Sequence, residues 1–172
     1  MRSFLLFFFV FWIFNTSIMS EQKIVFVDMD RLISFSKPGS SILNQLKDIS
    51  NKNLNFLKKE KNKFKEKEKK LIAQKNIISE ADFKDNIDEL KSEIKNYNKK
   101  RNEMIEKFNK SKVENTNEFL KLINLILVKY SNENEISLIL QKKNLIVGKT
   151  ELDITDEIIK LVNKDIINFE IK

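Results

Sequence analysis

Two apolar seams with heptad spacing, separated by a short break, constrain the fold of this chain more than any other feature. A repeat of 3.5 residues places its apolar members on one stripe of a helix, and such a stripe pairs with a second helix. Lys61 and Glu68 interrupt the first seam, and Arg101 interrupts the second. The apolar seam residues are Leu54, Leu57, Phe64 and Leu71 in the first helix and Phe83, Ile87, Leu90, Ile94, Tyr97, Met104 and Phe108 in the second.

The break between the two seams predicts a reversal of the chain. Ser79 is followed three residues later by Asp82, a spacing that resembles a capping box at the start of a helix. We therefore expect an antiparallel helical hairpin, the arm, over residues 41–111, with its tip near residues 76–82. Because the two helices bury only a narrow seam with charged members, the arm should be long and exposed.

Two short β segments flank the arm. Residues 23–28 are apolar without alternation, which is typical of a strand buried on both faces. Residues 135–141 and 145–148, with a reversal at residues 142–144, predict a β-hairpin. These segments meet only if the arm returns the chain to its starting point. We therefore predict an α+β, mostly α fold, in which residues 21–40 and 112–164 form a small β-containing body.

A body of this size favours oligomerisation. Three short strands make a marginal sheet whose edges are exposed. Association of several copies through their sheets would stabilise it. The residues expected in this association are Ile24, Val25, Phe26, Val27, Ile136, Leu138, Ile139, Leu140 and Ile146.

Three further helices are expected within or beside the body. Residues 28–33 predict a short helix that ends before Pro38, after which Ser40 or Ser41 caps the first arm helix. Residues 119–128 are apolar almost all round, so this helix must be buried in its own domain or against partners. A cap and acidic first-turn residues near position 155 predict a final amphipathic helix. Residues 165–172 suggest no role.

The composition argues against an enzyme and against a metal or cofactor site. The chain has no Cys and no His, which excludes a disulfide framework, a thiolate nucleophile and the commonest general base. Asp28 and Asp30 form the spacing of a metal pair, but no third ligand accompanies them, so helix capping is the better interpretation. We expect no cofactor.

Positive charge is concentrated in the arm. The net charge is +7, and residues 47–112 contain 20 basic and 12 acidic residues, which is +8. The lysine run at residues 58–70 is interpreted either as a solvated helix face or as an electrostatic lining. Apolar residues outside the seams need another reason to be exposed. The candidate binding residues, a distributed surface, are Phe56, Lys58, Lys59, Lys63, Lys65, Lys67, Lys70, Ile72, Ile78 and Ile105.

The first 20 residues have the pattern of a secretory signal peptide. Arg2 precedes an unbroken apolar run from residue 4 to residue 14, followed by a short polar stretch. In a helix this run spans about 16 Å, against about 30 Å for the hydrocarbon core of a membrane. An uncleaved anchor is the alternative. We expect cleavage after Ser20 and a mature protein outside the cytoplasm.

Two stretches carry a family resemblance. Residues 23–33, followed by Ser36-Lys37-Pro38-Gly39, and residues 148–161, which include Leu-Asp-Ile-Thr-Asp-Glu, resemble the opening and the end of Skp/OmpH proteins. The resemblance implies a homotrimeric periplasmic chaperone of a Gram-negative-type bacterium. Its arms would surround a cavity, bind unfolded outer-membrane β-barrel proteins without nucleotide and prevent their aggregation. Contact with the anionic membrane surface is also implied, and no nucleic acid is expected.

One departure from the family and two other functions stay open. Acidic residues at the tip, such as Glu80 and Asp82, put a tip-based contact with lipid in doubt. A structural or adaptor coiled coil of the envelope would bind one folded partner through the same seam. Basic-patch binding to lipopolysaccharide or nucleic acid would weaken strongly with salt. Cytosolic prefoldin has a similar outline, but the signal peptide argues against it.

Overall fold

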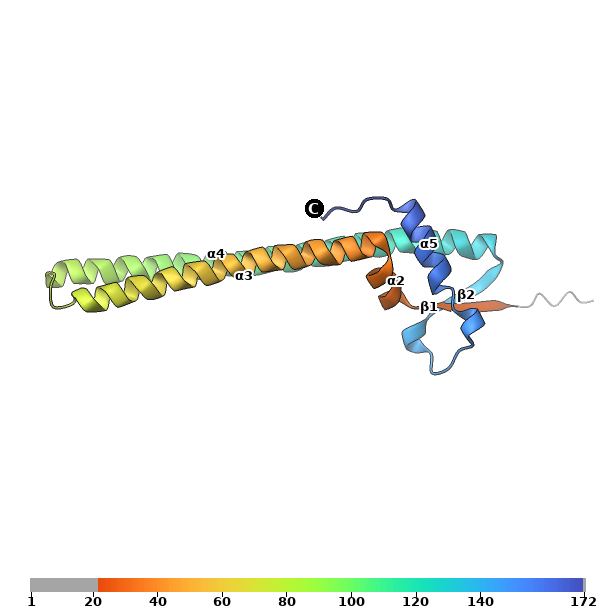
Figure 1. Cartoon of the computed structure of the whole chain (residues 1–172), viewed down its shortest axis with the longest axis horizontal. Helices are drawn as coiled ribbons and strands as arrows, with labels where there is room; N and C mark the ends of the chain where they lie inside the picture. Colours follow the sequence, from red (N-terminus) through yellow and green to blue (C-terminus); the bar gives the residue numbers. More distant parts are fainter. Residues whose placement is uncertain (1–21, 172) are drawn as a thin grey trace, which may run out of the picture.

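A long, thin hairpin of two helices projects from a small body in the computed structural model, which describes residues 22–171 (Figure 1). The predicted signal segment therefore lies outside the described residues. The elements in chain order are β1 (Lys23–Val27), α2 (Met29–Phe35), α3 (Lys37–Gln74), α4 (Glu80–Glu133), β2 (Ile136–Gln141), the 3₁₀ turns η1 (Lys142–Asn144) and η2 (Thr150–Leu152), and α5 (Thr155–Asp165). The predicted fold class is confirmed; association into trimers stays a prediction.

The arm consists of α3 and the first part of α4. Helix α3 has 38 residues and α4 has 54, so they are about 57 Å and 81 Å long at 1.5 Å per residue. The chain reverses at residues 75–79, and the Ser79 hydroxyl accepts a hydrogen bond of 3.1 Å from the Asp82 amide. The reversal therefore lies where it was predicted. Helix α4 continues without interruption from the tip into the body, past the predicted boundary at residue 111.

The start of α3 differs from the prediction. Its N-cap is Ser36, whose hydroxyl accepts from the Gly39 amide at 3.3 Å, and neither Ser40 nor Ser41 has that role. Pro38 lies in the first turn, where its missing N–H leaves no hydrogen bond broken. Pro38 therefore belongs to the first turn of this helix, which begins at Lys37 after the cap at Ser36.

The sheet has two parallel strands, with β1 beside β2 in the register Ile24–Leu138, Val25–Ile139 and Phe26–Leu140. Parallel neighbours need a long crossover connection, and here the whole arm is that connection. The chain leaves α4 through Glu135, whose φ of 55° lies in the left-handed region. The expectation that the arm returns the chain to its origin is confirmed.

The predicted β-hairpin is wrong. After β2 the chain enters η1 and then passes through residues 145–149 without forming a strand. The free edge of β1 is used instead by residues 153–154, since the Ile154 amide donates to the Phe26 carbonyl at 3.0 Å. Gly148 passes so close to the Phe26 ring that an added Cβ would lie 2.7 Å from a ring carbon. Gly148 therefore packs against Phe26, while residues 145–149 add no strand to the sheet.

The core of the body lies between the sheet, the root of the arm and α5. Helix α4 contributes the buried side chains Phe119 and Ile123, and the first turns of α3 contribute Ile42 and Leu46. The other buried members are Val25, Val27, Leu32, Ile126, Ile136, Ile154, Ile158, Val162, Ile166 and Phe169. Among the described residues, no helix combines the length and the apolar character needed to cross a membrane.

Candidate functional site

The arm is held together by a narrow seam. Leu90 is buried, and Leu57, Phe64, Leu71, Phe83, Ile87, Tyr97, Met104 and Phe108 are half-buried. The ring centroids of Phe64 and Tyr97 lie 5.3 Å apart at an interplanar angle of 71°, an edge-to-face contact. Ile94 is 38% exposed. The middle of the arm therefore follows the predicted register.

One position of α3 departs from the predicted seam. Leu54 is 61% exposed, whereas Phe56 is half-buried and lies under Lys100, whose Nζ is 4.6 Å from the ring centroid. Towards the tip, Lys67 forms an ion pair of 2.5 Å with Glu93 across the two helices. Charged side chains therefore take part in the seam at positions that the apolar pattern did not identify.

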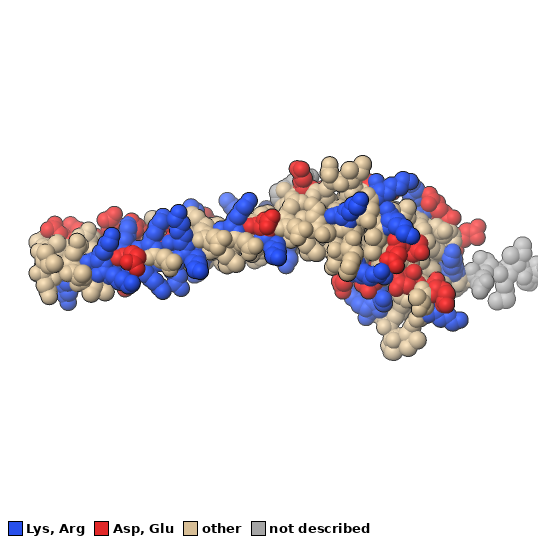
Figure 2. Space-filling model, viewed as in Figure 1, with Lys and Arg blue, Asp and Glu red and all other residues tan. Residues whose placement is uncertain are grey.

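One face of α3 is predominantly basic. It is lined by Asn55, Lys58, Lys59, Asn62, Lys63, Glu66, Lys67 and Lys70. The positive charges of two of these lysines are balanced by neighbouring carboxylates, because Lys63 pairs with Glu60 at 2.7 Å and Lys67 pairs with Glu93. Lys58, Lys59, Lys65 and Lys70 form no ion pair within residues 22–171. Figure 2 shows the basic side chains gathered along the middle of the arm.

In each of two ion pairs on the arm, a hydrogen bond shifts the pKa of one partner toward its charged form. A hydrogen bond to the Glu93 carboxylate raises the pKa of Lys67. A hydrogen bond from Lys63 lowers the pKa of Glu60. These groups are exposed, so the pairs contribute little stability. The two pKa shifts favour the charged forms of Glu60 and Lys67.

Several apolar side chains are exposed between the lysines. Ile72, Ile105 and Val113 are exposed on the helices, and Ile77 at the tip is 79% exposed. Ile78, a predicted binding residue, is half-buried instead. The sequence interpretation did not select Ile77 or Val113; the signal for Ile77 was an apolar residue in a polar turn. The arm thus offers dispersed apolar contacts on a basic background.

The body also exposes apolar surface. Of the residues expected in oligomer contacts, Val25, Phe26, Val27 and Ile136 are buried within their own chain, and Ile139 and Leu140 are half-buried. Ile24, Leu138 and Ile146 are exposed, as are Leu125 and Val128 of α4. A groove of about 430 Å³ lies between α4 and the sheet and includes Leu127, Val128 and Ile139. Of the residues predicted to make oligomer contacts, Ile24, Leu138 and Ile146 are therefore the ones exposed to another molecule.

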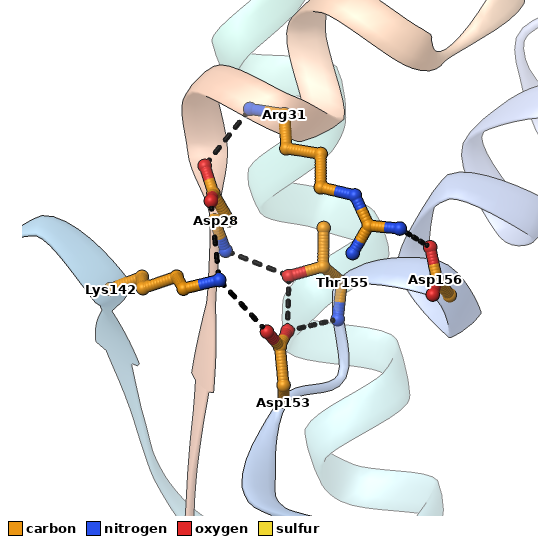
Figure 3. Close-up of polar contacts among 6 residues, drawn as sticks. All are labelled: Asp28, Arg31, Lys142, Asp153, Thr155 and Asp156. Carbon is orange, nitrogen blue, oxygen red and sulfur yellow. Dashed lines mark hydrogen bonds and ion pairs between the residues drawn. The ribbon is translucent and has the colours of Figure 1, made fainter. Parts of the chain in front are cut away.

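A polar cluster, the latch, joins the end of β1 to the start of α5 (Figure 3). Lys142 lies between two carboxylates, 3.3 Å from Asp153 and 3.5 Å from Asp28. The Thr155 hydroxyl accepts from the Asp28 amide at 2.9 Å and donates to Asp153. Arg31 donates to Asp156 at 2.7 Å. The latch therefore connects three stretches of the chain, namely residues 28–31, Lys142 and residues 153–156.

Contacts within the latch lower the pKa of Asp153. Burial raises the pKa of Asp153, but hydrogen bonds from Thr155 and Lys142 outweigh this effect and lower it overall. Asp28 also caps α2 by accepting from the Arg31 amide at 2.9 Å, as the capping interpretation predicted. Among residues 22–171 there is no group of three side chains suited to hold a metal ion.

Comparison with known proteins agrees with this architecture. Residues 23–162 match the family described as Outer membrane protein (OmpH-like). One similar solved structure is that of a candidate outer membrane chaperone, OmpH-like, from Caulobacter crescentus CB15. It has a TM-score of 0.81 and 15% sequence identity, and the match covers 89% of this chain and 90% of that chain, which shows a shared fold. Comparison with curated proteins gives no significant match. Since the family match extends over most of its length, the chain belongs to the OmpH-like family of outer membrane proteins.

Proposed function

We propose that this protein is a holding chaperone that binds unfolded outer-membrane β-barrel proteins and keeps them from aggregating. The observation that carries the proposal is the arm, which exposes apolar side chains such as Ile72, Ile77 and Ile105 together with lysines that form no ion pair within residues 22–171. An arm that only joined two folded parts would have no need of them. Membership of the OmpH-like family and the fold shared with a candidate chaperone support the same role.

Binding would be distributed over many weak contacts. A client held at several points dissociates slowly as a whole, although each contact breaks quickly. Lys58, Lys59 and Lys70 would attract acidic client segments and raise the rate of encounter. No step requires nucleotide hydrolysis. This mechanism suits a chain that works outside the cytoplasm, in the periplasm, after removal of its signal segment.

The holding unit would be a trimer whose arms surround a cavity. Apolar side chains that a second copy would cover, including Leu125, Val128 and Leu138, lie on neighbouring elements of the body. Within residues 22–171 the outer edge of β2 has no strand partner, so its backbone is open to pairing with another chain. Light scattering of the mature protein is expected to give the mass of three chains. A monodisperse monomer would contradict this arrangement.

The holding activity can be tested directly. A β-barrel protein diluted from urea is expected to stay soluble when the mature chain is present at trimer stoichiometry, and to scatter light without it. The same result is expected without ATP. If the client precipitates equally fast in both samples, the proposed function is wrong. Capture of one folded partner with no effect on unfolded chains would support the adaptor function instead.

A further inference from the structure

Residues 166–171 form an extended strap that packs on the root of the arm, beyond the segment matched to the family. In Figure 1 this segment leaves α5 and runs back along the base of the arm. Ile166 and Phe169 are buried, whereas Ile167, Asn168 and Glu170 are exposed. The strap thus buries two of its side chains, Ile166 and Phe169, and leaves the residues between them exposed.

The strap is bound through its backbone by one side-chain amide. Gln45 of α3 donates from Nε2 to the Phe169 carbonyl at 2.9 Å, and its Oε1 accepts from the Ile171 amide at 3.1 Å. The two backbone groups flank Glu170. In a parallel sheet, one residue bonds in the same way to the carbonyl and the amide on either side of its partner residue. The side-chain amide of Gln45 therefore takes the place of a backbone residue of a neighbouring strand.

The Gln45 amide is itself positioned by the arm. Its Nε2 also donates to the Ser41 hydroxyl one turn earlier on α3, at 3.1 Å. One large side chain adds selectivity, since the Phe169 ring packs edge-on against Phe119 with centroids 5.6 Å apart. The remaining groove, of about 370 Å³, includes Lys37 and Pro38.

These features describe a site for an extended polypeptide, not for one particular sequence. Backbone hydrogen bonds to Gln45 are available from any extended chain, and the position of Phe169, next to these bonds, favours a large apolar side chain. The strap has no helix or strand of its own, and such segments open at low cost compared with the core.

We propose that the arm root binds an extended client segment carrying a large apolar side chain, and that the strap is the internal occupant of this site. The inference rests on the proposed chaperone function and adds to it a site of defined geometry. A client held by the arms has a high local concentration, as the strap does, so the two compete on similar terms. Entry of a client segment releases the strap.

The first test measures binding of a labelled peptide with the sequence of residues 164–172 to full-length mature protein. Ile171→Pro removes the N–H that donates to Gln45, whereas the matched control Ile171→Ala keeps it. The peptide is expected to bind the proline variant about fivefold more tightly than the alanine variant, the effect of one hydrogen bond on the internal competitor. Equal affinities would overturn the inference.

Two controls show whether the peptide occupies the same groove. Gln45→Glu has almost the same shape but lacks the donor to the strap carbonyl, so in the Ile171→Pro background it is expected to weaken peptide binding by about tenfold. A peptide with alanine in place of its phenylalanine should also bind weakly. Circular dichroism checks that each variant keeps its helices. Binding that ignores both changes would place the peptide elsewhere and overturn the inference.

The client itself is tested with a photo-crosslinking amino acid at the exposed position Lys37. Without client it is expected to crosslink to the strap, and with an unfolded β-barrel protein it should crosslink to the client. A client that stays soluble but never crosslinks here overturns this site and leaves the chaperone function intact. A client that precipitates although the peptide test succeeds overturns the chaperone function alone.

Discussion

The Tyr97 ring packs edge-on against Phe64, and the Tyr97 hydroxyl donates to the Leu57 carbonyl at 3.3 Å, so one residue of α4 contacts both a side chain and the backbone of α3. Because the seam is narrow, this contact should contribute strongly to the pairing of the two helices. The arm should therefore open locally when it is lost.

Phe64→Ala is expected to destabilise the arm by about 1–2 kcal/mol, from the lost edge-to-face contact and the lost apolar burial. Hydrogen exchange should become faster around residues 57–97 and stay unchanged in the β1–β2 sheet. Leu54→Ala is the matched control, because Leu54 was expected in the same seam but is exposed. Equal effects of the two substitutions would contradict the observed register.

The sequence predicted the arm well because its seam has a regular period. The seam residues from Phe83 to Phe108 keep the expected spacing, and the largest departure is Leu54 of α3, which is exposed. Near Leu54, the Phe56 ring is half-buried and lies under the Lys100 ammonium. An apolar pattern contains no information on such a contact.

The body was predicted less completely because its contacts are distant in sequence. Where the β-hairpin was expected, residues 142–144 form a 3₁₀ turn, and β1 is bridged on its other edge by Asp153, which lies far from it in sequence. Gln45 was not recognised as a binding residue, since nothing near it in sequence indicates that it meets Phe169. The basic face of α3 was foreseen because it lies within one helix.

Ser36→Ala should destabilise the protein by about 1 kcal/mol, the usual cost of losing an N-cap. The Ser36 hydroxyl is buried and accepts from the Gly39 amide, so its loss leaves this amide without a partner. Ser40→Ala is the matched control, because Ser40 lies within the helix. Urea unfolding should shift the midpoint for the first variant and barely for the second. A larger shift for Ser40→Ala than for Ser36→Ala would indicate that Ser40, one of the two predicted residues, caps the helix.

The latch should make the stability of the body depend on acid. Because the pKa of Asp153 is lower in the folded chain than in the unfolded chain, its stabilising effect is complete above the unfolded value of about 4. It is then lost as the pH falls through the folded value. Asp153→Asn should therefore be less stable than the native chain at pH 7, and the difference should shrink below about pH 4.

Urea midpoints at a series of pH values measure this difference. Asp48→Asn removes one carboxylate from the exposed surface of α3 and serves as the control for a simple change of net charge. A constant gap between the Asp153→Asn variant and the native chain down to pH 3 would show that the carboxylate does not stabilise the latch through its charge.

The basic face of α3 should govern how a client is captured more than how the chain folds. Replacing Lys58, Lys59 and Lys70 by glutamine removes three charges that have no ion-pair partner within residues 22–171, so stability should change by less than about 0.5 kcal/mol. Client capture should become slower and less sensitive to salt, because attraction between exposed charges is screened. Replacing three exposed lysines of the body, Lys121, Lys129 and Lys160, changes the net charge equally and is the matched control. If both variants capture an unfolded β-barrel protein at the same rate over 50–300 mM salt (about the range where screening acts), net charge alone governs capture and the basic face has no special role.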